Sequence, residues 1–377
     1  TFQELDVGKQ VLEKYPQMKV AASMENHARH SGIHAAGILV TEEPVSKYCS
    51  VSGQNGAGQI DKKDAEDLNL LKIDALGLRT LSVLQDVLNQ AGWSREQLVN
   101  FPLDDEAAFA VLNEERYAGI FQFEGYALQS VTRQMKVHNF EDIAAITALA
   151  RPGPLNSGGT TEYIKRHTGA APVEYLHPLT ETITKVTNGV VVYQEQVMMI
   201  GRDVGGLSWE DVSSLRKAMS KSLGQEFFDT YFEKFKEGAE KNGINEDKAR
   251  YIWDHINTMG SWAFNRSHAV AYGLVSYWCC VLKSRFPLEY AAACLRNVKD
   301  DEQAVRLLRE VVREGLSYKS FDKFKSTENW SVQEGELIGG FIGIKGVGPK
   351  MAQDIINRRS LGQPLTPRQD KLLSAGE

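Results

Sequence analysis

The chain has 377 residues, of which 42% are hydrophobic and 24% charged, and its formal net charge is −6. This length allows a sizeable core and two or three domains, and the composition is that of an ordinary globular protein. The negative charge argues against a wholesale nucleic-acid coat protein, but it does not exclude a DNA enzyme, because phosphate affinity depends on local patches.

The cysteines and the longest apolar stretch indicate the cellular compartment of the protein. The four cysteines form no C-x-x-C pair, which favours reduced thiols in a cytoplasmic protein over a zinc site. The longest uncharged apolar stretch, Ala269 to Leu282, is shorter than the ~20 residues that span a bilayer, so it predicts a buried helix and no membrane partner. The chain begins at Thr1 within a helical pattern, which we interpret as a fragment, a processed product or half of a split protein.

The first hundred residues predict a small mixed α/β part. Helical spacing runs over 2–15 and ends at Pro16, and a second helix is expected over 20–30. The apolar runs 38–40 and 70–74 predict short buried strands, and 80–91 predicts a helix.

The region from 104 to 325 predicts mostly helix, with breakers at 151–154 and 158–159 and strand character only at 189–193. The predicted helices are 104–115, 140–149, 193–204, 209–219, 227–242, 248–259, 268–286 and 301–314. In the tail, a loop with several glycines leads into a helix that ends at Arg359.

Asp74 is the sharpest candidate for a catalytic residue. It ends an apolar strand and precedes Ala75-Leu76-Gly77, so its carboxylate should emerge at a sheet edge beside a turn. Two-metal phosphoryl transfer needs carboxylates held on rigid strands. The alternative is an Asp that caps the helix beginning near Thr80.

Three histidines, His27, His30 and His34, would share one side of a helix and invite a zinc hypothesis. No cysteine or carboxylate accompanies them at a fixed spacing, and Gly32 interrupts the helix. Structural or phosphate-contacting roles are therefore preferred.

Two further segments could bind a polyphosphate. Arg216, Lys217 and Lys221 place three cations on about two turns of helix, although a solvated helix surface explains them equally well. The segment from Ser261 to Tyr272 lies in a stretch without Asp or Glu and opens an apolar helix, which suits a phosphate or a stacked base. An ordinary helix capped by Ser267 is the other interpretation.

The glycines of the tail predict a helix-hairpin-helix contact to DNA. Gly346 and Gly348 precede a helix and let backbone N–H groups approach a phosphate, and Lys350 adds a charge. Such a hairpin contacts phosphates and does not read sequence. A simple glycine-rich turn is the alternative.

Together these segments resemble the α subunit of bacterial DNA polymerase III, the family C replicative polymerases. The resemblance covers nearly the whole chain, in the family's order. The matching segments are Ser31-Gly32-Ile33-His34-Ala35-Ala36-Gly37, Leu71-Lys72-Ile73-Asp74-Ala75-Leu76-Gly77-Leu78-Arg79-Thr80, Ile120-Phe121-Gln122-Phe123-Glu124, Ala150-Arg151-Pro152-Gly153-Pro154, Tyr193-Gln194-Glu195-Gln196-Val197-Met198, Leu215-Arg216-Lys217-Ala218-Met219 and Phe264-Asn265-Arg266-Ser267-His268-Ala269-Val270-Ala271-Tyr272.

The resemblance implies an α+β fold and a nucleotidyltransferase site. Residues 1–103 would be the second part of a polymerase β-like palm, 104–328 the helical fingers, and 329–377 the start of the helix-hairpin-helix region. In the family three aspartates hold two Mg²⁺ ions; Asp74 matches the third, with Lys72 beside it. The other two belong to an upstream Pro-Asp-x-Asp segment, and this sequence contains no Pro-Asp.

The resemblance also assigns a nucleotide site on the fingers. Its expected residues are Arg151, Arg216, Lys217, Lys221, Arg266 and His268. Arg266 stands where the family usually has Lys, and Ser222 where a second Lys often follows Lys221. Both departures leave the region basic, but the second weakens a phosphate clamp beyond Lys221.

The implied activity is template-directed DNA synthesis from dNTPs on primer-template DNA. The expected partners are an upstream polypeptide that carries the other carboxylates, a sliding clamp and other replisome proteins, and the chain alone is expected to be inactive. A non-catalytic DNA-binding or assembly piece derived from such a polymerase is the alternative, and an error-prone relative used in repair cannot be separated on these residues.

Overall fold

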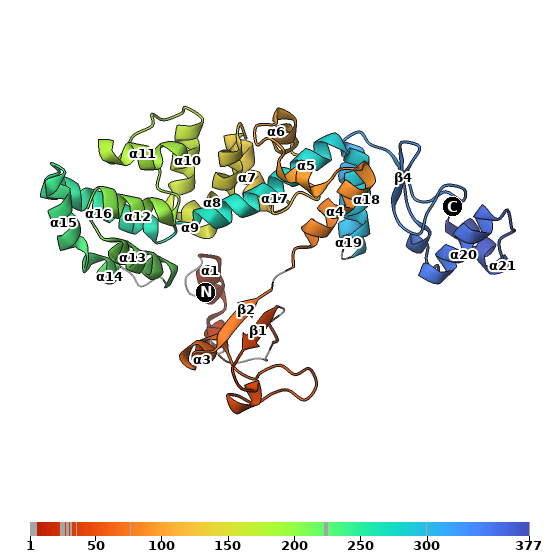
Figure 1. Ribbon diagram of the computed structural model, residues 1–377, viewed down its shortest axis with the longest axis horizontal. Helices are drawn as coiled ribbons and strands as arrows, with labels where there is room; N and C mark the ends of the chain where they lie inside the picture. Colours follow the sequence, from red (N-terminus) through yellow and green to blue (C-terminus); the bar gives the residue numbers. More distant parts are fainter. Residues whose placement is uncertain are drawn as a thin grey trace. The chain divides into compact units, whose positions relative to one another are not determined.

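A computed structural model describes residues 6–22, 27, 30, 32–34, 36–75, 77–221, 225–298 and 300–376. The chain divides into two compact units, Thr1–Leu78 and Arg79–Glu377. The first holds a two-stranded sheet with short helices, and the second is mostly helical, which confirms the expected α+β class (Figure 1).

In the first unit, the strands β1 (Gly37–Val40) and β2 (Leu71–Asp74) pair antiparallel. The helices are α1 (Asp6–Lys14), α2 (Lys19–Ala22) and α3 (Lys62–Asp67). Asp61 caps α3 by accepting the N–H of Asp64 at 2.9 Å. Both strands were predicted; residues 2–5 and most of 23–30, where helix was also expected, lie outside the described residues.

The prediction that these strands are buried is wrong. Ile38 pairs with Ile73 and Val40 with Leu71, so all four side chains share one face of the sheet. Their exposed fractions are 57%, 48%, 46% and 58% in that order. The opposite face carries Lys72 and Asp74, because successive strand residues point to opposite sides.

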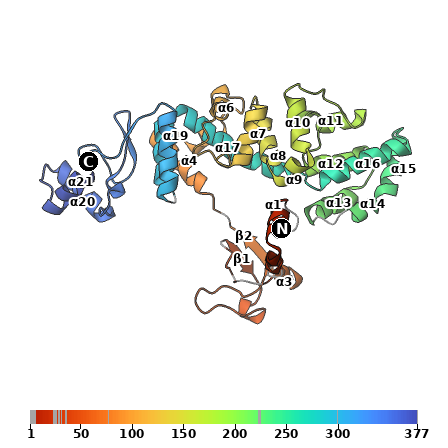
Figure 2. The same cartoon turned by 180° about the vertical axis from the view of Figure 1, so that it is seen from behind.

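The second unit is built around one long central helix, α17 (Arg266–Arg285). Its buried residues include Cys279, Cys280, Val281 and Leu282, which confirms the buried helix predicted from the apolar stretch. Around it pack α4 (Arg79–Ala91), α6 (Glu106–Asn113), α8 (Phe140–Leu149) and α18 (Pro287–Arg296) (Figures 1 and 2). The helix α19 (Asp301–Arg313) packs on α18.

A second core lies around Trp253, which is fully buried. It joins α12 (Gln194–Asp203), α13 (Trp209–Lys221), α15 (Phe232–Lys241) and α16 (Glu246–Gly260), with α14 (Gln225–Asp229) beside α13. The single helix predicted over 227–242 is wrong, since α14 and α15 are separate helices on either side of Thr230.

Shorter helices complete the unit: α5 (Arg95–Val99), α7 (Tyr126–Met135), α9 (Pro152–Ser157), α10 (Gly159–His167) and α11 (Glu181–Thr184). Single-turn 3₁₀ helices of the whole chain lie at Pro16–Met18, Val45–Lys47, Pro178–Thr180, Lys185–Thr187 and Phe341–Gly343. The strand predicted at 189–193 is wrong: only an isolated parallel bridge joins Tyr193 to Phe264. The predicted breaker at Pro152 starts a helix, because proline fits the first helical position.

The last part of the chain forms a three-stranded sheet followed by two helices. The strands β3 (Tyr318–Lys319), β4 (Ser331–Gln333) and β5 (Glu336–Ile338) lie in the order β3-β5-β4. The helices α20 (Pro349–Ser360) and α21 (Pro367–Gly376) form a small core with Phe341, Val347 and Leu373. The predicted glycine loop leading into a helix is confirmed.

The compact units part after Leu78, whereas the expected end of the palm was residue 103. The helices α4 and α5 therefore pack with the helical unit, and the expected assignment of 79–103 to the palm stays a prediction. None of the helices in the described ranges is long and apolar enough to cross a bilayer.

Candidate active site

Asp74 ends β2 with its carboxylate held by a neighbouring ammonium. Lys72 Nζ lies 2.7 Å from Oδ1 and 3.0 Å from Oδ2, because residues i and i+2 of a strand share a face. His34 Nδ1 is 3.7 Å from Oδ1. The hydrogen bond from Lys72 lowers the pKa of Asp74, and the side chain is 41% exposed, so the carboxylate is ionised and open to solvent at neutral pH.

Gly37 makes this arrangement possible. It lies opposite Asp74 in the sheet, and a Cβ there would come within 2.9 Å of both His34 Nδ1 and Lys72 Cε. A larger residue would push apart the two groups that face the carboxylate. The alternative role of Asp74 as a helix cap is not seen, since its hydrogen bond is to Lys72.

The residues around Asp74 supply one carboxylate to a metal. No group of three or more His, Cys, Asp or Glu side chains among the described residues could hold an ion. The carboxylate of Asp74 offers the kind of oxygen ligand that Mg²⁺ prefers, so the residues present fit one ligand of such an ion and not a complete set. Lys72 would have to yield part of its contact, because an ammonium and a metal ion compete for the same oxygens.

The zinc hypothesis for the three histidines gains no support. His27, His30 and residues 32–34 are described outside helix, so a common helix side for the three rings is not observed. All three histidines are exposed. His34 Nδ1 instead accepts the N–H of Ala36 at 3.2 Å and faces Asp74.

Three segments far apart in the sequence meet at the start of α17. Phe264 N–H donates to Val192 C=O, and Gln194 N–H donates to Phe264 C=O, both at 2.9 Å. Arg151 joins them from the start of α9: its Nη2 donates to Trp262 C=O and its guanidinium lies 4.1 Å from the centre of the Phe264 ring. We name this junction of residues 148–154, 192–196 and 262–268 the fingers junction.

Arg151 mainly links the segments of the fingers junction through hydrogen bonds to backbone carbonyls. Besides Trp262, it donates from Nε to Ala148 C=O at 3.1 Å. Burial lowers its pKa. Gly153 and Gly159 both lie against the Trp262 side chain, where a Cβ would come within 2.8 Å of Trp262 Cβ and 2.7 Å of its ring, respectively.

Arg266 is flanked by two glutamates that sequence reasoning missed. Its backbone N–H donates to Glu195 Oε2 at 2.9 Å, and its Nη2 lies 3.2 and 3.3 Å from the two carboxylate oxygens of Glu141. Asn265 donates to the other oxygen of Glu195 at 3.1 Å. Glu195 belongs to the quoted Tyr193-Gln-Glu-Gln segment, but Glu141 lies 125 residues from Arg266 and no local pattern marks it.

The start of α17 therefore offers less to a phosphate than the sequence predicted. Asn265, not Ser267, is the N-cap: its Oδ1 accepts the N–H of His268 at 2.8 Å. With the N–H of Arg266 on Glu195, two of the first helical donors are already used. The exposed ring of His268 stacks on Tyr272 at 4.0 Å between centroids and gives a flat surface beside them.

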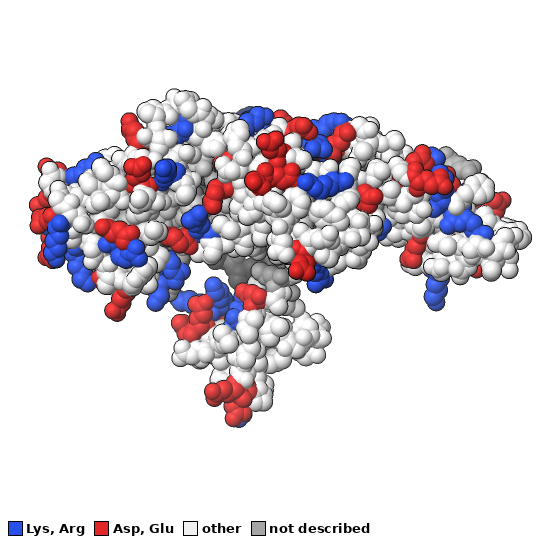
Figure 3. Space-filling view, turned by 45° about the horizontal axis from the view of Figure 1, so that its top comes forward, with Lys and Arg blue, Asp and Glu red and all other residues white. Residues whose placement is uncertain are grey.

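The basic helix α13 buries one side and presents cations on the other. Leu215, Ala218 and Met219 are buried, Arg216 is half-buried and Lys217 is exposed. The Lys221 side chain and Ser222 lie outside the described residues. On the face drawn in Figure 3, Lys and Arg are mixed with Asp and Glu over the helical unit, so local grouping must decide where an anion binds.

The C-terminal hairpin has the backbone that its glycines predicted. Gly346 adopts φ +93, which L-residues rarely reach, and Gly348 precedes α20 with no side-chain cap. A Cβ at Gly348 would meet nothing within 4 Å, so the backbone is open at this position. Whether Gly346, Gly348 and Lys350 contact DNA stays a prediction.

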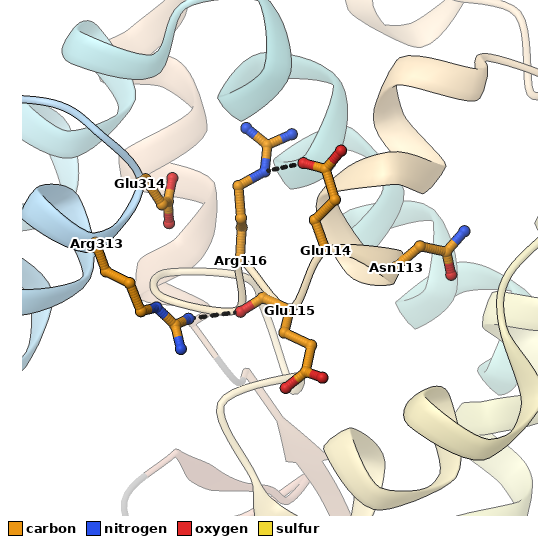
Figure 4. Close-up of a pocket in the computed structure, with 6 residues that line it drawn as sticks. All are labelled: Asn113, Glu114, Glu115, Arg116, Arg313 and Glu314. Atoms are coloured by element: carbon orange, nitrogen blue, oxygen red, sulfur yellow. Dashed lines mark hydrogen bonds and ion pairs between the residues drawn. The ribbon is translucent and has the colours of Figure 1, made fainter.

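A separate hollow of about 570 Å³ lies where the loop after α6 meets the end of α19 (Figure 4). Its cations are engaged: Arg116 Nε lies 3.1 Å from Glu114, and Arg313 donates to the backbone C=O of Glu115 at 2.8 Å. None of the expected nucleotide residues lines it. Three glutamates and two arginines line it, and this excess of acids does not favour a polyphosphate.

Comparison with known proteins decides the family. A family model described as the bacterial DNA polymerase III alpha subunit finger domain matches residues 77–243, and one described as the bacterial DNA polymerase III alpha NTPase domain matches 2–77. The chain belongs to the bacterial DNA polymerase III α family. The two family models meet at Gly77, next to the boundary between the compact units.

Curated relatives of the polymerase III α family match most of the chain. The DNA polymerase III subunit alpha of Aquifex aeolicus is 35% identical over 363 residues, which is 93% of this chain and 31% of that protein. Those of Haemophilus influenzae and Escherichia coli K12 are 34% and 33% identical over 92% and 91% of this chain, again 31% of their length. The chain thus spans about a third of these polymerase subunits.

The candidate site residues fall in different parts of the family-model matches. Lys72 and Asp74 fall in the NTPase-domain match, and Arg151, Arg216, Lys217 and Lys221 fall in the finger-domain match. Arg266, His268 and the hairpin lie beyond residue 243, outside both models.

Proposed function

We propose that this chain supplies part of the active site for template-directed DNA synthesis. The observation that carries the proposal is the ionised, exposed carboxylate of Asp74 at the end of β2, in the segment that matches the family's NTPase domain. Primer-template DNA and dNTPs would be the substrates. The upstream polypeptide, the sliding clamp and other replisome proteins stay predicted partners.

The reaction joins the primer 3′-hydroxyl oxygen, whose proton passes to solvent, to the α-phosphorus of the dNTP. It breaks the bond between that phosphorus and the oxygen that bridges to the β-phosphorus, releasing pyrophosphate. Mg²⁺, where bound, would offset charge on the reacting phosphate. Asp74 would hold one side of that ion. Lys72, 2.7 Å from the same carboxylate, lowers its pKa and so keeps Asp74 ionised.

The fingers residues would bind the triphosphate. Arg216 and Lys217 on α13 offer cations, and His268 offers a ring for stacking at the fingers junction. Arg266 can contribute only if it leaves Glu141, because its Nη2 is paired with that carboxylate. Arg151 would act through the position of Phe264, on which it stacks.

Primer extension tests the proposal. With one carboxylate of three, the purified chain should not extend a primer. Extension should appear after addition of a polypeptide that carries a Pro-Asp-x-Asp segment, and Asp74→Asn should abolish it. Extension by the chain alone, equal in wild type and Asp74→Asn, would contradict both the fragment interpretation and the assignment of Asp74.

A further inference from the structure

A hollow lined by aromatic rings lies between the three-stranded sheet and the α20–α21 segment. It measures about 540 Å³, and Tyr318, Phe321 and Trp330 contribute rings to its wall. Of the twelve residues that line it, one is a cation, Lys345, and none is Asp or Glu. We name it the aromatic groove. An apolar hollow with a single cation suits a flat ligand that carries negative charge.

The rings of the aromatic groove are held in place before any ligand binds. The Tyr318 and Trp330 rings meet edge to face at 5.9 Å between centroids, and Tyr318 stays 37% exposed. At the backbone, Asn329 Oδ1 accepts the main-chain N–H of Trp330 at 2.9 Å. Gly343 adds open backbone to the wall, since a Cβ there would meet nothing within 4 Å. A ligand would therefore meet a preformed stacking surface.

The charge around the aromatic groove differs from that of the rest of the chain. Residues 318–377 contain nine Lys and Arg against seven Asp and Glu, whereas the whole chain has a net charge of −6. Most acids here are paired, as Glu336 is with Lys319 and Glu334 with Lys325. Within the described ranges, Lys345 and Lys350 have no carboxylate partner. This segment is thus suited to an anion.

We propose that the aromatic groove binds single-stranded DNA. An unpaired base would stack on the exposed ring of Tyr318 and contact the Trp330 ring at its edge, while the adjoining phosphates would meet Lys345 and the N–H groups of Gly346 and Gly348. In a duplex the base faces are covered by their neighbours, so only an unpaired base can use these rings. The hairpin alone would not distinguish the two forms, because it contacts phosphates only. The inference does not depend on Asp74 or on catalysis.

Fluorescence anisotropy at low salt tests the proposal. It measures the binding of the intact chain to a labelled oligo(dT) 12-mer and to a duplex of equal length. Tyr318→Ala should weaken oligo(dT) binding at least about 5-fold, and Tyr318→Phe should bind like wild type, because the ring and not the hydroxyl stacks. Phe324→Ala is the matched control: Phe324 is 83% exposed in the same segment but does not line the groove. Equal oligo(dT) binding by wild type and Tyr318→Ala would overturn the proposal.

Tryptophan emission gives a readout that binding elsewhere on the chain does not reproduce. Oligo(dT) should quench the tryptophan emission of the wild-type chain. Trp330→Phe should remove the share of this quenching that comes from Trp330. Trp209→Phe, which replaces a 61% exposed ring on α13, should keep it. Two results would overturn the assignment to single-stranded DNA. One is a duplex that binds as tightly as oligo(dT) and depends on Tyr318 in the same way. The other is an apolar peptide that quenches the emission of Trp330 when oligo(dT) does not.

Discussion

Arg266 already has partners before any nucleotide arrives. Glu141 pairs with its guanidinium, and Glu195 accepts its backbone N–H, so one carboxylate engages the cation and a second holds its main chain. The Arg266–Glu141 pair is 40% and 44% exposed, and such pairs contribute at most about 1 kcal/mol. A triphosphate with several negative charges can therefore replace Glu141 at modest free-energy cost.

Glu141→Gln should tighten the binding of Mg·dATP to the intact chain by about 2- to 5-fold, the range that follows from an exposed ion pair. Removing the competing charge frees Arg266 without removing its other contacts. Isothermal titration calorimetry measures the change. Asp254→Asn, which breaks the exposed 2.8 Å pair with Arg250 elsewhere on the helical unit, serves as the control and should leave dATP affinity unchanged. Unchanged affinity in Glu141→Gln would mean that Arg266 does not bind the triphosphate.

Lys72→Met should raise the pKa of Asp74 toward its ordinary value near 4, because the hydrogen bond from Lys72 is the largest cause of the lowered pKa. A lowered folded-state pKa stabilises the fold above the ordinary pKa, and that contribution is lost as pH falls through the lowered value. The variant should lose most of it, since only the weaker charges of His34 and Lys62 still lower the pKa of Asp74. Carboxyl-carbon NMR titration reads the pKa directly. Lys62→Met, which removes a weaker and more distant charge, should shift it less.

Sequence reasoning could find Lys72 and Asp74 because both lie on one short strand, whose two-residue period places them side by side. It could not find the partners of Arg266. Glu141 and Glu195 come from other helices, and only the packing of α8, α12 and α17 brings them to one cation. His268 and Tyr272 are four residues apart on one helix, so their stacking follows from helical periodicity.

At the level of elements, the start of α17 is fixed by one side chain. Asn265 accepts the N–H of His268 and the hydroxyl of Ser267, and it donates to Glu195 on α12. The helix is 20 residues long and central to the larger core, so its first turn also sets the fingers junction. The sequence favoured Ser267 as the cap because serine is a common cap, but the chain turns into the helix two residues earlier.

Asn265→Ala should lower the free energy of unfolding by about 1–2 kcal/mol, the usual effect of losing an N-cap. Urea denaturation followed by circular dichroism measures it. Ser267→Ala removes only an exposed hydroxyl and should change the stability by less than about 0.5 kcal/mol. A larger loss in Ser267→Ala than in Asn265→Ala would restore Ser267 as the cap.

The elements that sequence failed to predict share a physical cause. Val190, Val191 and Val192 form an apolar β-branched run that reads as a strand, but they are buried individually in two helical cores and pair only locally with the loop at Phe264. The helix predicted over 227–242 breaks at Thr230, where the chain turns so that both Phe228 and Phe235 reach Trp253. Tertiary packing overrode local propensity in both places.

For the whole molecule, the two units differ in how much apolar surface they bury. The three hydrophobic cores formed by the described residues lie in Arg79–Glu377. In the described part of the first unit, Ala65 and Leu70 are the buried hydrophobic residues. The folding of the first unit therefore has little hydrophobic support of its own.

A chain truncated to residues 79–377 should keep the main thermal transition of the full chain within about 3 °C, since the cores remain intact. Residues 1–78 alone should show no cooperative transition. Circular dichroism melting curves of the three chains measure both. A shared transition that disappears on truncation would mean that the units fold as one.

The position of the Asp74 carboxylate depends on one alignment of β1 with β2. A slip of β2 by a single residue would turn Lys72 and Asp74 to the side now occupied by Ile73 and Leu71, because every side chain changes faces at once. The carboxylate would then lose its position beside Gly37 and His34. Four-residue strands resist such a slip only weakly. The observed register places His34 and Lys72 within 2.9 Å of where a Cβ of residue 37 would lie, so this alignment requires glycine at that position.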